Sequence, residues 1–535
     1  MRKLLLGDEA IAQGAIDGGL SGVYAYPGTP STEITEYIQV NKTAQERKIH
    51  SKWSANEKTA MEAALGMSYA GKRSMSCMKH VGMNVAADCF MNASITGVNG
   101  GMLIVAADDP SMHSSQNEQD SRYYGKFAMV PILEPSNQQE CYDMAYEGFE
   151  LSEKYKLPVL IRITTRVAHS RAGVATRPIK PQNQQTLPED KRQFVLLPAI
   201  ARKNYKRLLS VQTEIEKASE ESKWNQYFEG DNKSIGVIAC GIAYNYFREI
   251  FPEKSCPYPL LKVSQYPLPR KMVTKLASEV KRIIVLEEGY PLVEEWLKGY
   301  LEKEPVSGRL DGTLPRDGEL NPNIVAKAFN VPMNHETPVP SIVVPRPPAM
   351  CAGCSHIDVY TALNEALSKY TEGRVFSDIG CYTLGALPPF NAINTCVDMG
   401  ASITMAKGAA DAGLVPAVAV IGDSTFTHSG ITGLIDAVIE KSPITIIISD
   451  NESTSMTGGQ DSSAVGIIEN ICQAVGVKPD HIHVLLPMKK NHQQMVEIIS
   501  KELAFDGVSV IIPRRECIQK AVRRKKAEAK QKSNE

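Results

Sequence analysis

Short runs of apolar residues recur along the chain, separated by segments long enough to form helices. In the first part of the chain they occupy residues 21–26, 101–107 and 157–163, and residues 57–70 have a helical pattern. Runs of this kind are typical of strands buried on both faces, and a helix between two such strands makes a crossover connection. The pattern predicts an α/β fold built on parallel sheets.

The same alternation returns twice further along the chain. Strands are expected at 234–239 and 282–286, with a helix near Leu301, and again at 417–421, 444–449 and 508–512. Polar or proline-rich stretches separate the three groups. We therefore expect three doubly wound parallel-sheet domains. The predicted boundaries are domains at 1–180, 233–302 and 351–517, linkers at 181–232 and 303–350, and a basic tail at 518–535.

Charge and hydropathy exclude several classes of protein. The 535 residues include 59 Lys and Arg against 60 Asp and Glu, so the basic excess of a nucleic-acid-binding protein is missing. No segment approaches the roughly 18 uncharged apolar residues of a membrane span. The apolar run 4–6 is too short for a secretory signal. Eleven cysteines are too few for a disulfide scaffold. We expect a cytoplasmic protein with no nucleic-acid or membrane partner.

Two polar turns follow neighbouring predicted strands in the third domain. Gly422 and Asp423 come directly after the strand 417–421, and Asn451 comes just after the strand 444–449. Open α/β sheets bind ligands at the carboxyl ends of their strands. Carboxylate and amide oxygens suit Mg²⁺, with phosphate oxygens completing the coordination, and Gly422 would allow a diphosphate to approach the backbone. Each turn by itself is a common sequence in loops, so the prediction depends on the combination of the two turns.

The spacing of these turns resembles the metal–diphosphate motif of thiamine diphosphate enzymes. In that family an Asp, a residue 28 positions later and a backbone carbonyl two positions further hold the metal, and Asn451 lies 28 positions after Asp423. The resemblance implies that Asp423, Asn451 and the Ser453 carbonyl bind Mg²⁺. It also implies that Gly422 and Ser424 lie at the diphosphate of the cofactor.

A thiamine cofactor also needs a carboxylic acid at its aminopyrimidine ring. Glu57 begins an alanine-rich segment with Gly66 nine positions later, which resembles the glutamate helix of the pyrimidine-binding domain. A glutamate buried beside the cofactor suits this proton transfer. Glu57 is therefore the candidate acid and Glu62 the weaker one. The alternative is a glutamate that only stabilises the start of its helix.

Four longer segments carry a resemblance to one family. They are Tyr26–Glu33, Met78–Asn84, Ala107–Arg122 and Asp378–Thr383. Over roughly residues 5–518 the chain resembles the large (alpha) subunit of indolepyruvate:ferredoxin oxidoreductase, a thiamine diphosphate-dependent 2-oxo acid:ferredoxin oxidoreductase. The resemblance implies oxidative decarboxylation of aryl 2-oxo acids to aryl-acetyl-CoA, with release of CO₂ and electron transfer to ferredoxin. It also implies a small beta subunit as partner and CoA as a substrate.

Three polar residues in these segments are further catalytic candidates. Thr29 matches a position where related enzymes place a threonine hydroxyl near the substrate. Arg122 offers a bidentate fork for the substrate carboxylate. His80 is a candidate for proton transfer or for a hydrogen bond to the substrate. For each of them, a structural polar residue on a loop is the alternative.

Four cysteines in and just beyond the third domain fit an electron relay. Cys351 and Cys354 form a C-x-x-C pair, Cys381 follows a predicted strand, and Cys517 lies just past the last strand. Relatives bind a [4Fe–4S] cluster through such a set, and soft thiolates suit iron–sulfur clusters. A zinc site that includes His356, or no metal, are the alternatives. Residues 518–535 hold no further cluster motif, so we expect a partner to carry electrons onward.

Two other functions compete with this one. A non-oxidative thiamine diphosphate decarboxylase or synthase would have the same domain order but would not need the four cysteines. A catalytically silent scaffold would have no need for Glu57, Asp423 and Asn451 together.

The basic residues after Cys517 suggest a docking element for an acidic ferredoxin, and the alternative is a frayed, solvated helix end.

Overall fold

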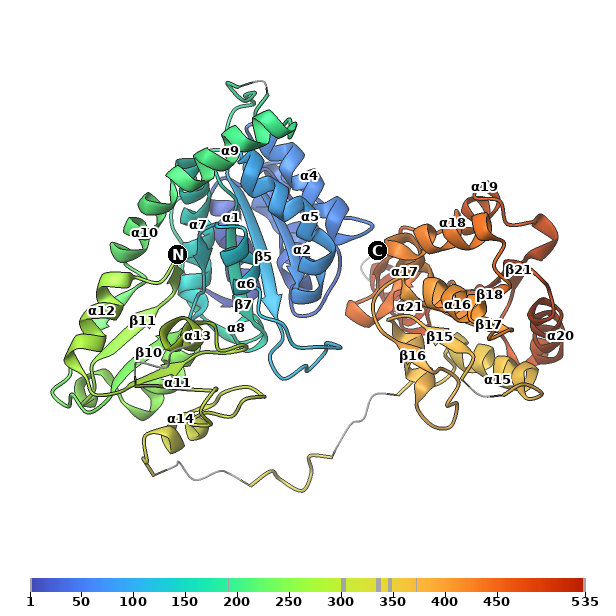
Figure 1. Ribbon diagram of the computed structural model, residues 1–535. Coiled ribbons are helices and arrows are strands. Elements are labelled where there is room, and N and C mark those ends of the chain that lie inside the picture. Colours follow the sequence, from blue (N-terminus) through green and yellow to red (C-terminus); the bar gives the residue numbers. More distant parts are fainter. Residues whose placement is uncertain are drawn as a thin grey trace. The chain divides into compact units, whose positions relative to one another are not determined.

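The chain folds into two compact units in a computed structural model (Figure 1). Unit 1 comprises residues 1–338 and unit 2 comprises residues 339–535. The structure describes residues 2–190, 192–299, 305–332, 338–344, 349–371 and 373–532. The division falls inside the segment that the sequence marked as the second linker.

The first sheet of unit 1 has seven strands in the order β12-β6-β7-β5-β4-β2-β3. All neighbours are parallel except β12 and β6, which are antiparallel. Each strand that we predicted here is present, shifted by at most two residues at either end. The strands are β2 (Gly22–Ala25), β3 (His50–Trp53), β4 (Ser74–Lys79), β5 (Met102–Asp108), β6 (Ile132–Leu133), β7 (Val159–Thr164) and β12 (Gln265–Tyr266).

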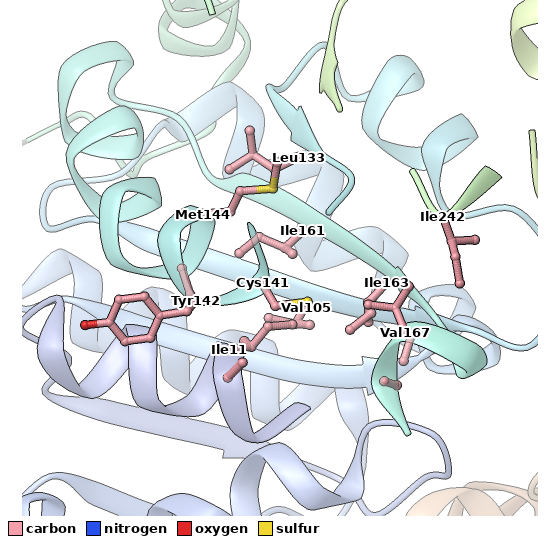
Figure 2. Close-up of a cluster of buried hydrophobic side chains, with 14 of the residues drawn as sticks. Ile11, Val105, Leu133, Cys141, Tyr142, Met144, Ile161, Ile163, Val167 and Ile242 are labelled. Atoms are coloured by element: carbon pink, nitrogen blue, oxygen red, sulfur yellow. The ribbon is translucent and has the colours of Figure 1, made fainter. Parts of the chain in front are cut away.

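Helices cover both faces of this sheet. On one face, Ile11, Val105 and Cys141 belong to one buried apolar cluster, which Figure 2 shows between helices and strands. Asparagine side chains cap two of the helices, because Asn56 accepts from the Thr59 amide and Asn137 from the Glu140 amide. The helices are α1 (Gly7–Asp17), α2 (Thr32–Val40), α3 (Lys42–Glu46), α4 (Glu57–Tyr69), α5 (His80–Thr96), α6 (Arg122–Phe127), α7 (Gln138–Tyr155) and α8 (Thr165–Ala168). At the edge, β1 (Arg2–Leu6) pairs with β8 (Arg171–Ala175).

The second sheet of unit 1 has five strands in the order β14-β13-β10-β11-β9, with only β9 antiparallel to its neighbour. Its apolar residues join the cluster that covers the first sheet, so the two sheets form one unit. Leu301, where we expected a helix, lies outside the described residues. The elements are β9 (Gln226–Phe228), β10 (Gly236–Cys240), β11 (Leu260–Val263), β13 (Ile283–Leu286), β14 (Val306–Ser307), α11 (Ala243–Ile250), α12 (Arg270–Glu279), α13 (Leu292–Lys298) and α14 (Pro322–Ala328).

Both expected linkers contain regular structure. In the first, α9 (Pro198–Ser210) and α10 (Gln212–Glu220) place Leu208 and Ile215 against the first domain. In the second, β14 and α14 belong to the five-stranded sheet and its cover. These segments differ from the prediction because each buries only a few apolar side chains within a polar sequence.

Unit 2 holds a six-stranded, fully parallel sheet in the order β16-β15-β17-β18-β22-β21. Two apolar clusters fill its two faces, so the sheet is covered on both sides. The α/β class with three mainly parallel sheets is confirmed. The elements are β15 (Val375–Ser377), β16 (Thr395–Cys396), β17 (Ala417–Gly422), β18 (Ile444–Ser449), β21 (Ile482–Leu485), β22 (Ser509–Pro513), α15 (Ser355–Leu367), α16 (Ala401–Asp411), α17 (Asp423–Thr425), α18 (Ile431–Glu440), α19 (Ile468–Ala474), α20 (His492–Leu503) and α21 (Ile518–Lys532).

None of the helices in the described part of the chain is both long enough and apolar enough to cross a membrane.

Candidate functional site

The two polar turns of unit 2 leave the sheet side by side. β17 and β18 are parallel neighbours, with Gly422 opposite Ser449 at their carboxyl ends. Asp423 begins α17 directly after β17, and a single turn of π-helix follows it at 426–430. Asn451 comes two residues after the end of β18. The prediction that these residues meet at one edge of the sheet agrees with this register.

The Asp423 carboxylate is buried, with 2% of the residue exposed. Its pKa is raised to about 7, mainly by burial; a hydrogen bond from the Ser424 amide lowers it, and the Asp450 carboxylate contributes a smaller increase. Among the described residues, Oδ2 of Asp423 and the Ser453 hydroxyl have no hydrogen-bond partner. A buried carboxylate oxygen without a donor needs an explanation, and an absent cation provides one. This oxygen-only donor set therefore fits Mg²⁺.

The loop after β18 is shaped by its own hydrogen bonds. The Asn451 side-chain oxygen accepts from the Ser453 amide at 3.1 Å. Glu452 between them has φ of 60°, a left-handed conformation that turns the chain back. The hydroxyls of Ser424 and Thr454 are hydrogen-bonded at 2.8 Å, which joins this loop to the one after β17. The three predicted metal ligands therefore belong to one connected pair of loops.

Gly422 has a packing reason that the sequence did not reveal. A Cβ atom at this position would lie 2.6 Å from the Tyr382 ring. The Tyr382 hydroxyl contacts the Ile379 carbonyl at 3.0 Å and the Thr425 hydroxyl at 3.2 Å. Gly422 thus leaves room for an aromatic ring that braces the loop of Asp423.

The four candidate cysteines gather in unit 2. Burial raises the pKa of the Cys381 thiol to about 11, and the charges of Cys354, Cys517 and Cys351 add to the increase. Burial likewise raises the pKa of Cys354, with smaller effects of Cys351 and Cys517. The Cys354 amide also donates to the Cys351 carbonyl at 3.0 Å. Cysteines as far as 166 positions apart in sequence are therefore close enough for their charges to act on one another.

The four cysteines do not form a ready tetrahedral zinc site. Zinc–sulfur bonds of about 2.3 Å would bring four sulfurs to roughly 3.8 Å from one another. Within the described residues, these cysteines do not form a group whose ligand atoms lie within 4.8 Å of one another. His356, a ligand in the zinc alternative, is buried beside the Tyr382 ring, and burial lowers its pKa to about 4.

Cys517 is hydrogen-bonded directly to the loop 450–454, which carries two of the candidate Mg²⁺ ligands. The Cys517 amide donates to the Asn451 carbonyl at 3.1 Å, and the Arg515 amide donates to the Asp450 carbonyl at 3.0 Å. Beyond Cys517, the Lys520 ammonium in α21 donates to the Glu452 carbonyl at 2.7 Å. The first turn of the basic tail is therefore anchored to the loop, which differs from the frayed end that the sequence allowed.

In unit 1, Glu57 and Glu62 occupy different environments. Glu57 begins α4 and is 5% exposed, whereas Glu62 lies on the surface and pairs with Lys58. A Cβ atom at Gly82 in α5 would lie 2.7 Å from both Cγ and Oε1 of Glu57. The Glu57 carboxylate thus lies directly against the backbone of α5. Of the two glutamates, only Glu57 has the predicted buried position.

Thr29 and Lys79 lie at the same edge of the first sheet. Lys79 ends β4, and its ammonium donates to the Ser114 carbonyl at 2.9 Å. The Ser114 hydroxyl contacts the Thr29 carbonyl at 3.4 Å, and the Lys79 side chain packs over Gly28. Burial lowers the pKa of Lys79, and the carboxylates of Asp109 and Glu57 oppose the shift. We assigned Lys79 no role, although its place at the end of a buried strand in a family-like segment was a usable signal.

Arg122 is placed differently from the prediction. It has no exposed surface, and its guanidinium binds Asp120 through Nε and Nη2. Nη1 contacts the Tyr266 hydroxyl at 3.2 Å and the Glu287 carboxylate at 3.0 Å. Nη2 also donates to two carbonyls, at 3.3 and 3.0 Å. A guanidinium has five N–H donors, and here they all face groups of unit 1, so no fork is left for a substrate carboxylate.

His80 is also fully buried. Its Nε2 contacts the Asn117 carbonyl at 3.1 Å, which attaches the start of α5 to the loop 109–121. Nδ1 is buried without a partner among the described residues. This placement makes His80 a support of the loop rather than a group that lines open space.

The comparisons with known proteins define the class first. Residues 13–223 match the family described as "Pyruvate flavodoxin/ferredoxin oxidoreductase, thiamine diP-bdg". Residues 378–512 match "Thiamine pyrophosphate enzyme, C-terminal TPP binding domain". The first match extends past α10, in agreement with the packing of α9 and α10 on the first domain. The chain thus has the two cofactor-binding domains of a thiamine diphosphate enzyme.

Three curated relatives identify the family within this class. The chain is 39% identical to the "Indolepyruvate oxidoreductase subunit IorA" of Archaeoglobus fulgidus, over 96% of this chain and 86% of that protein. It is 38% and 37% identical to the proteins of the same name from Methanothermobacter thermautotrophicus and Pyrococcus abyssi, with the same two coverages. The chain belongs to the indolepyruvate oxidoreductase subunit IorA family. A solved 2-oxoglutarate:ferredoxin oxidoreductase from Magnetococcus marinus aligns with a TM-score of 0.49 and 17% identity, over 62% of this chain and 65% of that chain.

Proposed function

We propose that the chain is the thiamine diphosphate-binding subunit of an enzyme that oxidatively decarboxylates aryl 2-oxo acids. The products are an aryl-acetyl-CoA and CO₂, and the electrons pass to ferredoxin. One observation carries the proposal: the Cys517 amide donates a hydrogen bond to the carbonyl of Asn451, so a candidate cluster ligand lies next to a candidate Mg²⁺ ligand. A non-oxidative thiamine enzyme has no use for the quartet of Cys351, Cys354, Cys381 and Cys517.

In unit 2, Asp423, Asn451 and the Ser453 carbonyl would hold Mg²⁺, and Ser424 would bind the diphosphate. The unpartnered oxygen of Asp423 supports this assignment. Thiamine diphosphate, when bound, supplies the electron sink that decarboxylation of a 2-oxo acid requires. The Asp423 carboxylate would offset the charge of the ion that neutralises the diphosphate.

In unit 1, Glu57 would hold the proton at the aminopyrimidine ring nitrogen of the cofactor. Its burial and its contact with Gly82 support this role, because both fix the carboxyl group in one position. A positioned acid or base contributes about 10²- to 10⁴-fold to a rate.

Lys79 would bind the substrate carboxylate, a role that we first expected of Arg122. The guanidinium of Arg122 is committed to Asp120 and Glu287, whereas the ammonium of Lys79 lies at the strand end near the Thr29 loop. An ammonium with three rotatable donors keeps capacity beyond its bond to the Ser114 carbonyl. The Thr29 hydroxyl would act beside it on the same substrate.

Cys351, Cys354, Cys381 and Cys517 would hold one [4Fe–4S] cluster, which accepts electrons one at a time. The Gln519 amide donates to the Cys351 sulfur at 3.4 Å, and such bonds tune a cluster's potential. A small partner subunit would complete the enzyme in the cytoplasm, and ferredoxin would take up the electrons.

The proposal is tested on protein purified anaerobically with its partner subunit. Cys517→Ser should lose the iron, the broad absorbance near about 400 nm and the reduction of a viologen dye by an arylpyruvate with CoA. Cys396→Ser is the control, because this thiol of unit 2 lies outside the quartet. Its sulfur contacts the Asp378 carbonyl and the Thr383 hydroxyl, and a serine hydroxyl can make the same contacts. If Cys517→Ser retained full dye reduction, the quartet would carry no electrons. Release of CO₂ without any acceptor would instead identify a non-oxidative decarboxylase.

A further inference from the structure

Three potential metal ligands converge in unit 1, and none of them has been given a role above. Asp8 lies in the first turn of α1, Glu33 in the first turn of α2, and His169 directly after α8 (Figure 1). One ligand atom from each lies within 4.8 Å of the other two. His169 Nε2 lies 3.5 Å from Glu33 Oε2.

The backbone holds these three segments together. The start of α1 is in such close contact with the end of α8 that a Cβ at Gly7 would lie 2.2 Å from the Val167 carbonyl. α1 also packs along α2. The convergence of the side chains is therefore fixed by the fold and not by one flexible rotamer.

Asp8 is the unusual member of the group. It has no exposed surface, and neither carboxylate oxygen accepts a hydrogen bond from a donor among the residues that the structure describes. Burial raises the pKa of Asp8 well above its usual value, and the carboxylates of Glu33 and Glu9 raise it further. A protonated Asp8 is in hydrogen-bond reach of Glu33. A buried carboxylate without a donor or a positive partner is costly. The partly exposed His169 is the one cationic group of this cluster, and it bonds to Glu33.

We propose that Asp8, Glu33 and His169 bind one divalent transition-metal ion of the Mn²⁺, Fe²⁺ or Zn²⁺ type. Two carboxylates and one imidazole make a mixed oxygen and nitrogen set, which suits these ions better than Mg²⁺ or Ca²⁺. Metal–ligand bonds of about 2.1 Å place neighbouring ligand atoms roughly 3 Å apart, so the three side chains need only a small closing movement.

The exposure of the cluster allows an ion to enter. The side chains of His169 and Glu33 are 34% and 35% exposed, so water can complete the coordination shell. The ion would join the start of α1 and the end of α8 to the start of α2, and Glu33 in α2 lies four residues after Thr29. The site is distinct from the one at Asp423, which belongs to unit 2.

Mn²⁺ is the probe for this site, because thiolates bind it weakly and the cysteine quartet does not compete. The full-length chain, saturated with Mg²⁺ and thiamine diphosphate, is titrated with Mn²⁺, and the bound ion is counted by electron paramagnetic resonance. We expect one Mn²⁺ per chain. Asp8→Asn should abolish this binding, and His169→Gln should weaken it by at least about tenfold. Glu36→Gln is the matched control, since it removes the same charge one turn further along α2 from an exposed position.

Thermal melting without the metal separates binding from misfolding. Asp8→Asn should melt no lower than the unsubstituted chain, because it removes a buried charge that has no partner. Equal Mn²⁺ counts in the unsubstituted chain and in Asp8→Asn would overturn the proposal. So would the absence of Mn²⁺ from both, in which case a proton shared by Asp8 and Glu33 neutralises the pair.

Discussion

Replacing Gly82 by alanine tests whether Glu57 acts from the position that the structure gives it. The new methyl carbon would lie 2.7 Å from Cγ and Oε1 of Glu57 and 3.0 Å from Cδ. Ordinary contacts between such atoms begin near 3.4 Å. The carboxyl group must therefore move by about 0.7 Å or more, or adopt another rotamer. The substitution changes no atom of Glu57 itself.

The expected effect on the rate is large and the effect on the fold is small. Alanine is favoured over glycine in a helix by about 1 kcal/mol, which offsets part of the steric strain. A misplacement of about 1 Å at a catalytic group can cost roughly 10²-fold. We expect kcat to fall about a hundredfold, equivalent to about 2.7 kcal/mol in the barrier, with little change in the melting temperature.

Gly66→Ala is the matched control, because a Cβ at Gly66 in the same pair of packed helices would meet no atom within 4 Å. Both variants are assayed anaerobically by dye reduction with an arylpyruvate and CoA, and their affinity for thiamine diphosphate is measured by calorimetry. Gly66→Ala should keep full activity. If Gly82→Ala were equally active, the Glu57 carboxyl would not be the positioned acid that we assign.

Three further predictions concern a candidate Mg²⁺ ligand, the candidate substrate ligand and the pH dependence of stability. Asp423→Ala should weaken the binding of thiamine diphosphate with Mg²⁺ by at least about a hundredfold in calorimetry, while Asp436→Ala on the exposed face of α18 should not; equal affinities would refute the ligand assignment. Lys79→Met should raise the KM for the 2-oxo acid about ten- to a hundredfold more than it alters the KM for CoA, and Lys79→Arg should restore part of the loss; a change in kcat alone would contradict the binding role. Burial raises the pKa of Glu288 from 4.5 to about 7. Between about pH 4.5 and about pH 7, the folded chain therefore keeps a proton on Glu288 that the unfolded chain releases. This group contributes on the order of 3 kcal/mol to the free energy of unfolding at low pH, and the contribution is lost as the pH rises through that range. Urea unfolding at about pH 5 and about pH 8 should show this difference in the unsubstituted chain and a smaller one in Glu288→Gln; an identical difference in both would refute it.

Local sequence patterns were sufficient for the strands and for the residues at their ends. The strand β18 was predicted at the residues where it lies, and Asp423 and Asn451 follow neighbouring parallel strands as expected. The choice of Glu57 over Glu62 agrees with their burial. These features could be predicted because a buried strand and a helix start each depend on a few consecutive residues.

Contacts between distant residues could not be predicted in this way. The partners of Arg122 include Glu287 and the Glu288 carbonyl, which follow it by more than 160 positions. The position of Arg122 in a family-like motif suggested that it binds the substrate. In the structure, Glu287 directly after a strand of the second sheet supplies the counter-charge of Arg122 instead. The same limit applies to α9 and α10, whose few apolar residues become informative only when the surface that they cover is known.

The long motif at 107–122 has a structural reason that follows from these contacts. Three of its aspartates are hydrogen-bonded to other residues of the same segment. Asp108 accepts from Ser121, Asp109 accepts from Ser114 and Ser115, and Asp120 accepts from the Arg122 guanidinium. The loop is therefore set in one conformation by many short-range bonds rather than by a substrate.

What the loop presents in that conformation is the Ser114 carbonyl, which binds the ammonium of Lys79. Lys79 in turn lies within the electrostatic reach of Glu57, the candidate acid. Buried ion pairs such as Arg122–Asp120 give little net stability, because the loss of hydration offsets their attraction, but a single broken partner is costly. Such a network resists partial rearrangement. If Lys79 binds the substrate as we propose, the motif would act on the site indirectly, because its Ser114 carbonyl holds the ammonium of Lys79.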